Sequence, residues 1–502
     1  MRTSRVMVAV LGQLATTVVG KRTECPSNAC ASLAAALPGD VAYPNTTSYQ
    51  QANSYWSARQ AEALPDCFVS PKNTEAVSVV MKILTARNKP FTVKSGGHTA
   101  FMGGSSVTAG VTVDLANLNN ITVSEDGQTV SVGPGNRWID VSQALDPLGL
   151  AVVGGRAGDV GVSGLILGGG ISYFSERKGW ACDNVRNFEV VVASGDIVNA
   201  SPEENEDLYW ALRGGGGSNF GIVTRFDLAS FEQGDIWSSS LVFAGALNTT
   251  LIPLFQDLTV NGLPSDPDGH TYFVLTHQPA FGGYIVLTSF FHATIPSPPD
   301  STPPIFTPFR SVPGPLFDST SVVNISTQSQ SINIPYGSRQ TWWDTTIAAT
   351  SADFMVEIVS LFEARNDALF AAAGGSPVVP FLNFQPISTN VLSAMRQRGG
   401  NSMGLDASGG PLMIVQLTVS WEDPSLDAII EESLQELIGV IERRAEELGL
   451  GNGFVYMNYA GSTQRVQHRF GPDSEKRLKA IAKKWDPQGK LAQWRGYFKL
   501  ED

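Results

Sequence analysis

A histidine that follows two glycines, His98 in "SGGHT" at residues 95–99, is the group in this chain whose type and setting first suggest chemistry. A neutral imidazole is nucleophilic, and its unperturbed pKa of about 6.5 lets it exchange a proton near neutral pH. The chain has only 5 histidines, and the flanking glycines leave room for a flat ring system. Two interpretations are open: a residue that holds a ligand, or a loop histidine that only makes hydrogen bonds.

Glycine is dense in four places, where backbone N–H groups can approach a ligand closely and form nests that hold phosphate oxygens. Of the 50 glycines, many fall in "SGGH" at 95–98, "VGGRAGDVGVSGLILGGG" at 153–170, "RGGGG" at 213–217 and "SNFG" at 218–221. A dinucleotide suits such loops. The G-x-G-x-x-G motif of a Rossmann fold is absent, because Asn219 stands where the last glycine would follow Gly214 and Gly216. No P-loop motif occurs either.

A G-x-S-x-G motif, "GNSMG" at 400–404, is typical of the nucleophile elbow of a hydrolase. An elbow needs an apolar strand before its serine and a helix after it. Here "AMRQRG" precedes and "LDASGGP" follows. We therefore predict a loop rather than a catalytic serine.

Composition narrows the class of protein. A chain of 502 residues that is 42% hydrophobic and 16% charged is globular and long enough for two or three domains. Its formal net charge of -13 does not suit binding to nucleic acid, whose phosphates require clustered Lys and Arg, so we expect no such partner. Residues 1–20 suit a cleaved signal peptide, with a buried helix as the alternative. No membrane-length apolar run follows, and we expect a secreted monomer without a membrane span.

Cysteines and sequons agree with export. Because Cys25, Cys30, Cys67 and Cys182 show no CxxC spacing, we expect no metal site. In an oxidising compartment Cys67 could pair with Cys25 or Cys30, and the sequence does not choose between them. Candidate glycosylation sites stand at Asn45, Asn120, Asn199, Asn248 and Asn324.

Helices and strands alternate around the glycine clusters and must position them. "SPKNTEAVSVVMKILTARNKP" predicts a helix capped by Ser70 with Pro71 in its first turn, and "FTVKS" at 91–95 predicts a strand. Residues 111–150 predict two or three strands with an Asp126-Gly127 turn, then a helix around Val141.

The pattern of the sequence changes near residue 233, where we expect a domain boundary. Beyond it, strand-like runs at 269–278, 282–294 and 412–421 predict a sheet, and 423–451 predicts a helix that begins at Pro424. A last helix is predicted with a Ser474 cap and a stop before Asp486-Pro487. The fold class is therefore α+β, with an N-terminal segment at 21–59 and further regions at 60–232, 233–450 and 451–502.

Five ordered motifs resemble one family. They are the "GGH" at 96–98, "VGVSGLILGGG" at 160–170, "WACDNVRNFEVVVASGDIV" at 180–198, "NEDLYWALRGGGGSNFGIVTRF" at 205–226, and "FVYMNYAGS" through "RLKAIAKKWDPQGKL" at 454–491. Together they resemble flavin oxidases of the vanillyl-alcohol oxidase and p-cresol methylhydroxylase (PCMH) type, in the berberine bridge enzyme-like branch. The resemblance implies a two-part PCMH-type FAD-binding domain at 60–232, a substrate domain with an antiparallel sheet covered by helices at 233–450, and a C-terminal segment that returns to the first.

The resemblance also implies how the cofactor is held. The histidine of this motif is the one bonded to the flavin, so His98 is expected to tether FAD covalently. Many relatives add a cysteine tether three residues before "VGVSG", where this chain has Ala157, so a single tether is expected, with Cys182 buried instead. The remaining cofactor contacts implied are Ser95, Gly96, Gly97, Thr99, Gly161, Ser163, Gly164, Gly169, Gly221, Ile222 and Val223.

For catalysis the resemblance implies Tyr459 as a base over the flavin, with Asn458 near the ring. The pKa of a tyrosine, about 10, must fall for that role, through a nearby cation or the flavin. Relatives often continue with an aspartate where this chain has Ala460 or Gly461, so a purely structural tyrosine is the alternative. Gln385 and Gln416 are expected to face the substrate.

The implied reaction is hydride transfer from a small molecule to FAD, with dioxygen reoxidising the cofactor to give hydrogen peroxide. The missing second tether favours a small secondary metabolite as substrate. A mono- or oligosaccharide is the alternative, and a flavin-holding cyclase or a non-redox binding module is a remote one.

Overall fold

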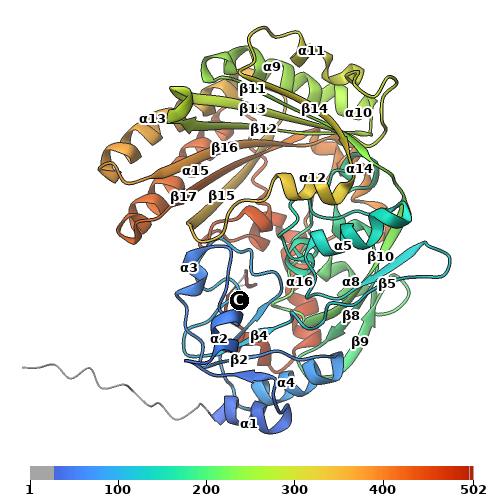
Figure 1. Cartoon of the computed structure of the whole chain (residues 1–502). Coiled ribbons are helices and arrows are strands. Elements are labelled where there is room, and N and C mark those ends of the chain that lie inside the picture. The colour runs from blue at the N-terminus through green and yellow to red at the C-terminus, as the bar shows by residue number, and fades with distance from the viewer. Residues whose placement is uncertain (1–27, 497, 501–502) are drawn as a thin grey trace, which may run out of the picture.

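Three β-sheets organise the chain, whose computed structural model describes residues 28–496 and 498–500 (Figure 1). Two smaller sheets lie in the lower part of Figure 1 and a seven-stranded sheet lies in the upper part. The fold class is α+β, as the sequence predicted. The predicted signal peptide at 1–20 and Cys25 lie outside the described residues.

The first sheet has four strands in the order β1-β2-β4-β3. β2, β4 and β3 run parallel, and β1 is antiparallel to β2. Helices α1 and α4 pack their apolar residues on this sheet, and a disulfide between Cys30 and Cys67 joins α1 to β2. The bounds are α1 Asn28–Ala36, β1 Val41–Ala42, β2 Cys67–Val69, α4 Thr74–Ala86, β3 Phe91–Lys94 and β4 Val111–Asp114.

The second sheet is antiparallel, in the order β5-β6-β10-β8-β9, with β7 also paired to β10. The Asp126-Gly127 turn joins β5 to β6, where Gly127 has a φ of 67° that suits glycine. The helix predicted around Val141 is α5. The bounds are β5 Ile121–Val123, β6 Thr129–Val132, α5 Trp138–Leu145, β7 Leu150–Val152, α6 Val162–Leu167, α7 Ser175–Lys178, β8 Val185–Val191, β9 Ile197–Ala200, α8 Glu206–Leu212 and β10 Ile222–Glu232.

The third sheet is antiparallel in the order β14-β11-β13-β12-β16-β17-β15. The three strands predicted at 269–278, 282–294 and 412–421 are β12, β13 and β17. The bounds are β11 Ile236–Ala244, β12 Gly269–Gln278, β13 Gly283–His292, β14 Phe317–Val323, β15 Arg339–Ala348, β16 Val378–Ile387 and β17 Leu412–Trp421.

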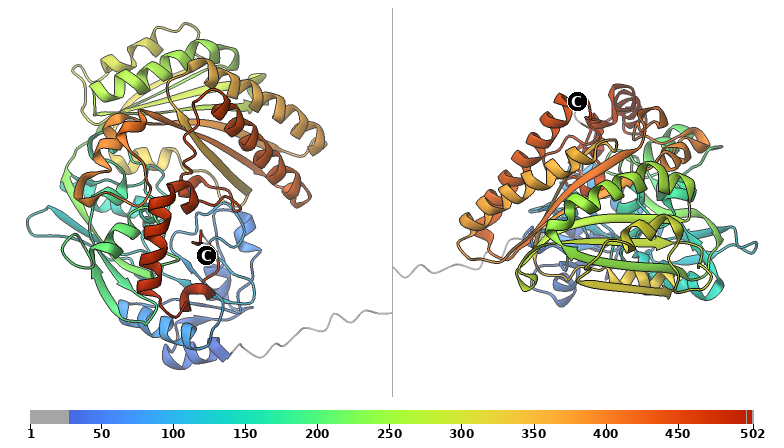
Figure 2. Two further views of the ribbon diagram at one scale, coloured as in Figure 1. Left: turned by 180° about the vertical axis from the view of Figure 1, so that it is seen from behind. Right: turned by 90° about the horizontal axis from the view of Figure 1, so that it is seen from above.

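Side chains on the third sheet alternate between two environments, because successive residues of a strand point to opposite faces. Phe273, Leu275, Phe384 and Leu417 point into a core formed with the helices that cover one face, α9 (Asn248–Asp257), α13 (Ala352–Ala373) and α15 (Asp427–Glu447). Figures 1 and 2 show these helices on the outer side of the sheet. The opposite face is therefore free to line a site.

After α15 the chain returns to the two smaller sheets. Residues 454–457 enter the core around the second sheet, and α16 (Pro472–Trp485) packs against α8. Figure 2 shows this segment beside the lower part of the molecule. The remaining helices are α2 Thr47–Ala52, α3 Ala58–Ala61, α10 Leu263–Ser265, α11 Thr307–Arg310, α12 Ile325–Ser331 and α14 Thr389–Ala394.

Two predicted helix starts were wrong. Asn73 caps α4, its side chain accepting from the Ala76 backbone N–H, so Ser70 and Pro71 precede the helix. Asparagine caps as well as serine does, which is why the local pattern did not separate them. The last helix begins at Pro472, and Ser474 lies inside its first turn. Its predicted end before Asp486 is confirmed.

Ser402 does not form a nucleophile elbow. It lies between a short 3-10 turn and β17, it is buried, and its hydroxyl donates to the backbone carbonyl of Arg213. The predicted loop is confirmed. Within the residues that the structure describes, no helix has the length and apolar character needed to cross a membrane.

Candidate active site

A cavity of about 550 Å³ lies between glycine-rich loops and the uncovered face of the third sheet. One side, which we call the loop wall, is formed by lining residues of the segments 95–105 and 156–165, and the side chain of Arg156 extends from it toward the other side. The other side, the sheet wall, consists of side chains spaced two apart on β12, β16 and β17: Tyr272, Val274, Phe381, Asn383, Gln385, Gln416 and Thr418. Residues 456–460 close the cavity from the C-terminal segment.

The loop wall depends on two glycines that touch. A Cβ placed on Gly161 would lie 2.4 Å from the backbone nitrogen of Gly96, and one on Gly96 would lie 2.5 Å from the Cα of Gly161. No side chain fits there, so the two loops present backbone to the cavity side by side. Gly164, by contrast, has open space around it.

The structure gathers almost all of the predicted site residues around this cavity. The predicted residues that line it are Ser95, Gly96, Gly97, His98, Thr99, Gly161, Ser163, Gly164, Gly221, Ile222, Val223, Gln385, Gln416, Asn458 and Tyr459. Gly169 is the exception, because it is not a lining residue and a Cβ there would meet the Trp180 ring at 2.7 Å. Its φ of 117° gives it a structural reason to be glycine.

His98 is held by an aromatic ring and faces a carboxylate. Its ring stacks on Trp56 with 4.1 Å between centroids. Its Nε2 lies 3.5 Å from Oδ1 of Asp159. Both side chains are nearly buried, yet neither that nitrogen nor either Asp159 oxygen has a hydrogen-bond partner among the described residues. Buried polar atoms of this kind are rare without a ligand or water to satisfy them.

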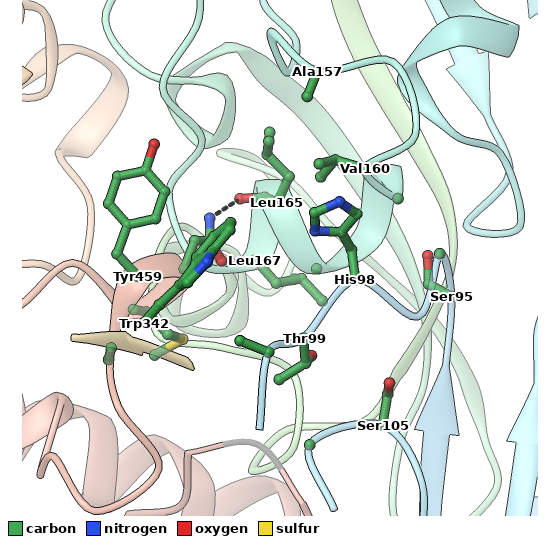
Figure 3. Close-up of a pocket in the computed structure, with 18 of the residues that line it drawn as sticks. Ser95, His98, Thr99, Ser105, Ala157, Val160, Leu165, Leu167, Trp342 and Tyr459 are labelled. Atoms are coloured by element: carbon green, nitrogen blue, oxygen red, sulfur yellow. Dashed lines mark hydrogen bonds between the residues drawn. The ribbon is translucent and has the colours of Figure 1, made fainter. Parts of the chain in front are cut away.

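Figure 3 shows His98 and Tyr459 on different sides of the cavity, with the Trp342 ring on the Tyr459 side. The Trp342 centroid is 5.4 Å from that of Tyr459 and 6.1 Å from that of His98. A flat ligand attached to His98 would therefore lie among aromatic rings and reach toward Tyr459.

Ala157 lines the cavity and Cys182 does not. Cys182 is fully buried, and burial raises the pKa of its thiol well above the usual value. This confirms that Cys182 is a buried small residue. It has neither the position nor the thiolate character of a second ligand tether.

Arg156 is a site residue that the sequence analysis missed. Its Nη2 donates to the Tyr459 hydroxyl at 2.8 Å and to Oε1 of Gln385 at 2.5 Å, and its Nη1 lies 3.1 Å from Nε2 of His270. The guanidinium also lies over the ring of Tyr272 at 5.2 Å. Tyr459 thus has the nearby cation that a tyrosine base requires.

Burial sets the protonation of the groups around Arg156. It lowers the pKa of His270 well below 6.5, and the positive charge of Arg156 lowers it further. Burial also raises the pKa of Tyr272. His270 is therefore neutral and Tyr272 is un-ionised at neutral pH, so the charge of Arg156 is not offset by these residues.

Asn458 and Tyr456 connect the C-terminal segment to the loop wall. Nδ2 of Asn458 donates to the Leu165 carbonyl, drawn in Figure 3, and to the Tyr456 hydroxyl. That hydroxyl in turn accepts from the backbone N–H groups of Gly170 and Ile171. Asn458 lines the cavity, but its amide N–H groups are engaged in holding α6.

A flavin dinucleotide fits the chemistry of these walls. The loop wall offers backbone without side chains where a phosphate chain could lie, a histidine that lines the cavity, and an aromatic ring stacked on that histidine. No sequence signal was strong enough to single out five other residues of the site: Arg156, Asp159, His270, Tyr272 and Trp342. The spacing of two along β12, β16 and β17 could have grouped Tyr272 with Gln385 and Gln416.

Comparison with known proteins gives three results that agree. Residues 65–201 match a family model described as an FAD binding domain. The FAD-dependent monooxygenase tpcD of Cochliobolus heterostrophus is 34% identical over 491 residues, which cover 92% of this chain and 92% of that protein.

Two solved structures share the fold. BBE-like 1 of Physcomitrella patens has a TM-score of 0.75 and 19% identity, covering 94% of this chain and 99% of that one. Glucooligosaccharide oxidase of Acremonium strictum has a TM-score of 0.75 and 19% identity, covering 94% and 98%.

Proposed function

The chain belongs to the PCMH-type, berberine bridge enzyme-like FAD-linked oxidoreductases, and from that premise we propose that it is an oxidase of a small secondary metabolite with FAD tethered through His98 alone. The observation that carries the proposal is the pair of facing walls. The loop wall presents backbone glycines and His98, and Arg156 extends from it to meet Gln385 of the sheet wall and Tyr459 of the C-terminal segment.

When bound, FAD supplies the hydride acceptor, and this chain's residues supply position and proton transfer. The loop wall, with Ser95, Gly96, Gly97, Thr99, Gly161, Ser163 and Gly164 and with Gly221, Ile222 and Val223 nearby, would hold the cofactor. Asp159 would accept from Nε2–H of His98 and leave the other ring nitrogen for the tether. This follows because the two atoms face each other with no other partner among the described residues.

Tyr459 is the proposed base. Its hydroxyl accepts from Arg156 at 2.8 Å, so a cation lies beside the phenol oxygen. Gln385 holds the same hydroxyl at 3.2 Å and is fixed by Gln416, whose Oε1 accepts from Nε2 of Gln385 at 2.9 Å. Together they orient the phenol oxygen so that it can take a substrate proton as hydride leaves. Asn458 acts by holding α6 and the loop wall in place.

The first test is the absorption spectrum of purified protein before and after acid precipitation, for wild type and His98→Ala. We expect yellow colour to stay with precipitated wild type and to pass into the supernatant for the variant. Flavin released from both proteins would show non-covalent binding and contradict the tether. Properly folded, FAD-supplied protein that holds no flavin would contradict the function itself.

The second test measures H2O2, ¹⁸O in the product and the range of substrates, and it separates four possible roles. An oxidase gives one H2O2 for each substrate oxidised and no oxygen from ¹⁸O2 in the organic product. A monooxygenase, the activity in the name of tpcD, would instead place ¹⁸O in the product. Turnover with mono- or oligosaccharides but not with alcohols, amines or phenols would support the carbohydrate alternative, and a bound flavin inert to every donor would support a non-redox role.

We further propose that the protein is secreted, glycosylated and monomeric, and that residues 60–232 and 233–450 are its FAD-binding and substrate domains. The Cys30–Cys67 disulfide supports an oxidising compartment. The exposed positions of Asn45, Asn120 and Asn199 suit glycans.

A further inference from the structure

Arg156 extends from the loop wall to the sheet wall, and none of its contacts among the described residues is a carboxylate. Its three polar partners are the amide oxygen of Gln385, the hydroxyl of Tyr459 and the ring of His270. Burial and the charge of Arg156 keep His270 neutral by lowering its pKa. No carboxylate of the described residues lies within 4.0 Å of the guanidinium.

The carboxylate nearest to the site serves another group. Asp159 is the one acidic residue among those that line the cavity, and its Oδ1 faces His98 at 3.5 Å. The cavity therefore has a permanent cation facing the sheet wall and, in the part of the chain that the structure describes, no carboxylate paired with it. An arginine stays charged in a protein, and a charge removed from water without a counter-ion is costly.

The guanidinium also retains donors. Of its five N–H groups, two on Nη2 reach Tyr459 and Gln385 and one on Nη1 reaches His270. Its Nε–H and one N–H of Nη1 have no acceptor among the described residues. The Tyr272 ring under the guanidinium holds it in a fixed plane.

We propose that Arg156 binds an anionic oxygen group of the substrate, either a carboxylate or an ionised phenol or enol. This inference rests on the proposed function, because it names the chemical class of the molecule that is oxidised. A substrate anion here would offset the charge of Arg156 and place an adjacent C–H near Tyr459. A neutral sugar would bring no negative charge to Arg156, whereas an anionic substrate would supply acceptors for its Nε–H and its remaining Nη1–H.

The test uses flavin absorbance as a reporter of binding, which needs no turnover. Holoprotein is titrated with two matched pairs of probes: benzoate against benzamide, and pentafluorophenol, which is ionised at neutral pH, against neutral pentafluorobenzyl alcohol. We expect one anion to bind wild type about tenfold or more tightly than its neutral partner, as a charge-assisted hydrogen bond implies. The pair that shows the difference identifies carboxylate or phenolate as the source.

Variants assign the effect to this residue. Arg156→Gln is expected to remove the difference within the pair, and Arg156→Lys to keep part of it. Arg186→Gln removes the same charge from an exposed position on β8 outside the cavity and is expected to match wild type. The wild-type comparison stands even where Arg156→Gln does not fold.

The inference is overturned if yellow wild-type protein binds acid and neutral partner equally in both pairs, if none of the four probes changes its spectrum, or if Arg156→Gln keeps the difference. Failure of the proposed function looks different, since folded protein without flavin gives no spectrum to perturb.

Discussion

The loop wall and the sheet wall enclose one cavity but are built on opposite principles. The loop wall excludes side chains where Gly96 touches Gly161. The sheet wall consists of side chains, and its Gln385 meets Arg156 from the facing loop at Tyr459. Under the proposed function, the first wall would hold the cofactor and the second would contact the substrate.

The largest effect should come from closing the loop wall. Gly161→Val places carbon atoms within the backbone of the facing loop, where the first of them would lie 2.4 Å from the Gly96 nitrogen. We expect a loss of about 1 to 3 kcal/mol in the free energy of unfolding and no retained flavin. Thermal unfolding and the ratio of flavin to protein absorbance measure both.

Gly164→Ala is the matched control for that variant. It adds a methyl group three residues further on, inside α6, where nothing lies within 4 Å. Its unfolding temperature should equal or exceed that of wild type, because alanine favours a helix. Equal damage from both variants would contradict the special role of the glycine contact.

The next effect concerns the two tyrosines of the C-terminal segment. Tyr459→Phe removes the proposed base and should slow anaerobic flavin reduction by substrate about 100-fold or more, without loss of stability. Tyr456→Phe should instead lower stability and leave the rate of flavin reduction unchanged, because the backbone N–H groups of Gly170 and Ile171 lose their acceptor. The expected loss in the free energy of unfolding is about 1 to 3 kcal/mol. A wild-type rate in Tyr459→Phe would remove Tyr459 from the mechanism.

These contrasts show what the sequence could and could not predict. The residues of the loop wall sit in short glycine-rich runs, so their character is visible locally, and His98 was found from its two neighbours. Gly169 belonged to the same pattern but packs on Trp180, because a glycine can be required by a neighbour as well as by a ligand.

The sheet wall comes from strands that are distant in the chain. Asn383 lies opposite Gln416 and beside Val274 only because of the strand register. Arg156 reaches Tyr459 across 303 residues, and no local pattern predicts such a contact. The pairing of Cys67 with Cys30 was undecided for the same reason, since it depends on where α1 packs.

A buried carboxyl group where α7 meets α14 gives a pH-dependent effect on the free energy of unfolding. Glu176 on α7 is buried and accepts from the hydroxyl of Ser388, the residue that caps α14. Burial raises the pKa of Glu176 from 4.5 to about 7. The folded protein therefore holds a proton that the unfolded chain loses above about pH 4.5.

The sign follows from that difference. The stabilisation from protonated Glu176 is complete below about pH 4.5 and is lost as pH rises toward 7, by at most about 3 kcal/mol. Glu176→Gln should thus lose less stability than wild type between about pH 5 and about pH 8. An equal loss in both proteins, measured by thermal unfolding, would show that Glu176 is not the group responsible.

The smallest effect is expected from Asp159→Asn. The amide keeps the size of the carboxylate but no longer attracts the proton of His98 Nε2, 3.5 Å away in the native protein. We expect slower and incomplete covalent attachment, seen as a larger share of flavin released by acid, with unchanged unfolding temperature. Complete attachment at the wild-type rate would show that Asp159 does not orient His98.

The most direct measurement of the central claim is the mass of the flavin-bearing peptide after protease digestion of acid-precipitated protein. We expect a single flavin-modified peptide, with fragmentation placing the flavin on His98 and none on the peptide that contains Cys182. Flavin on any other residue, or flavin found entirely in the acid supernatant, would contradict the assignment of the loop wall as the cofactor site.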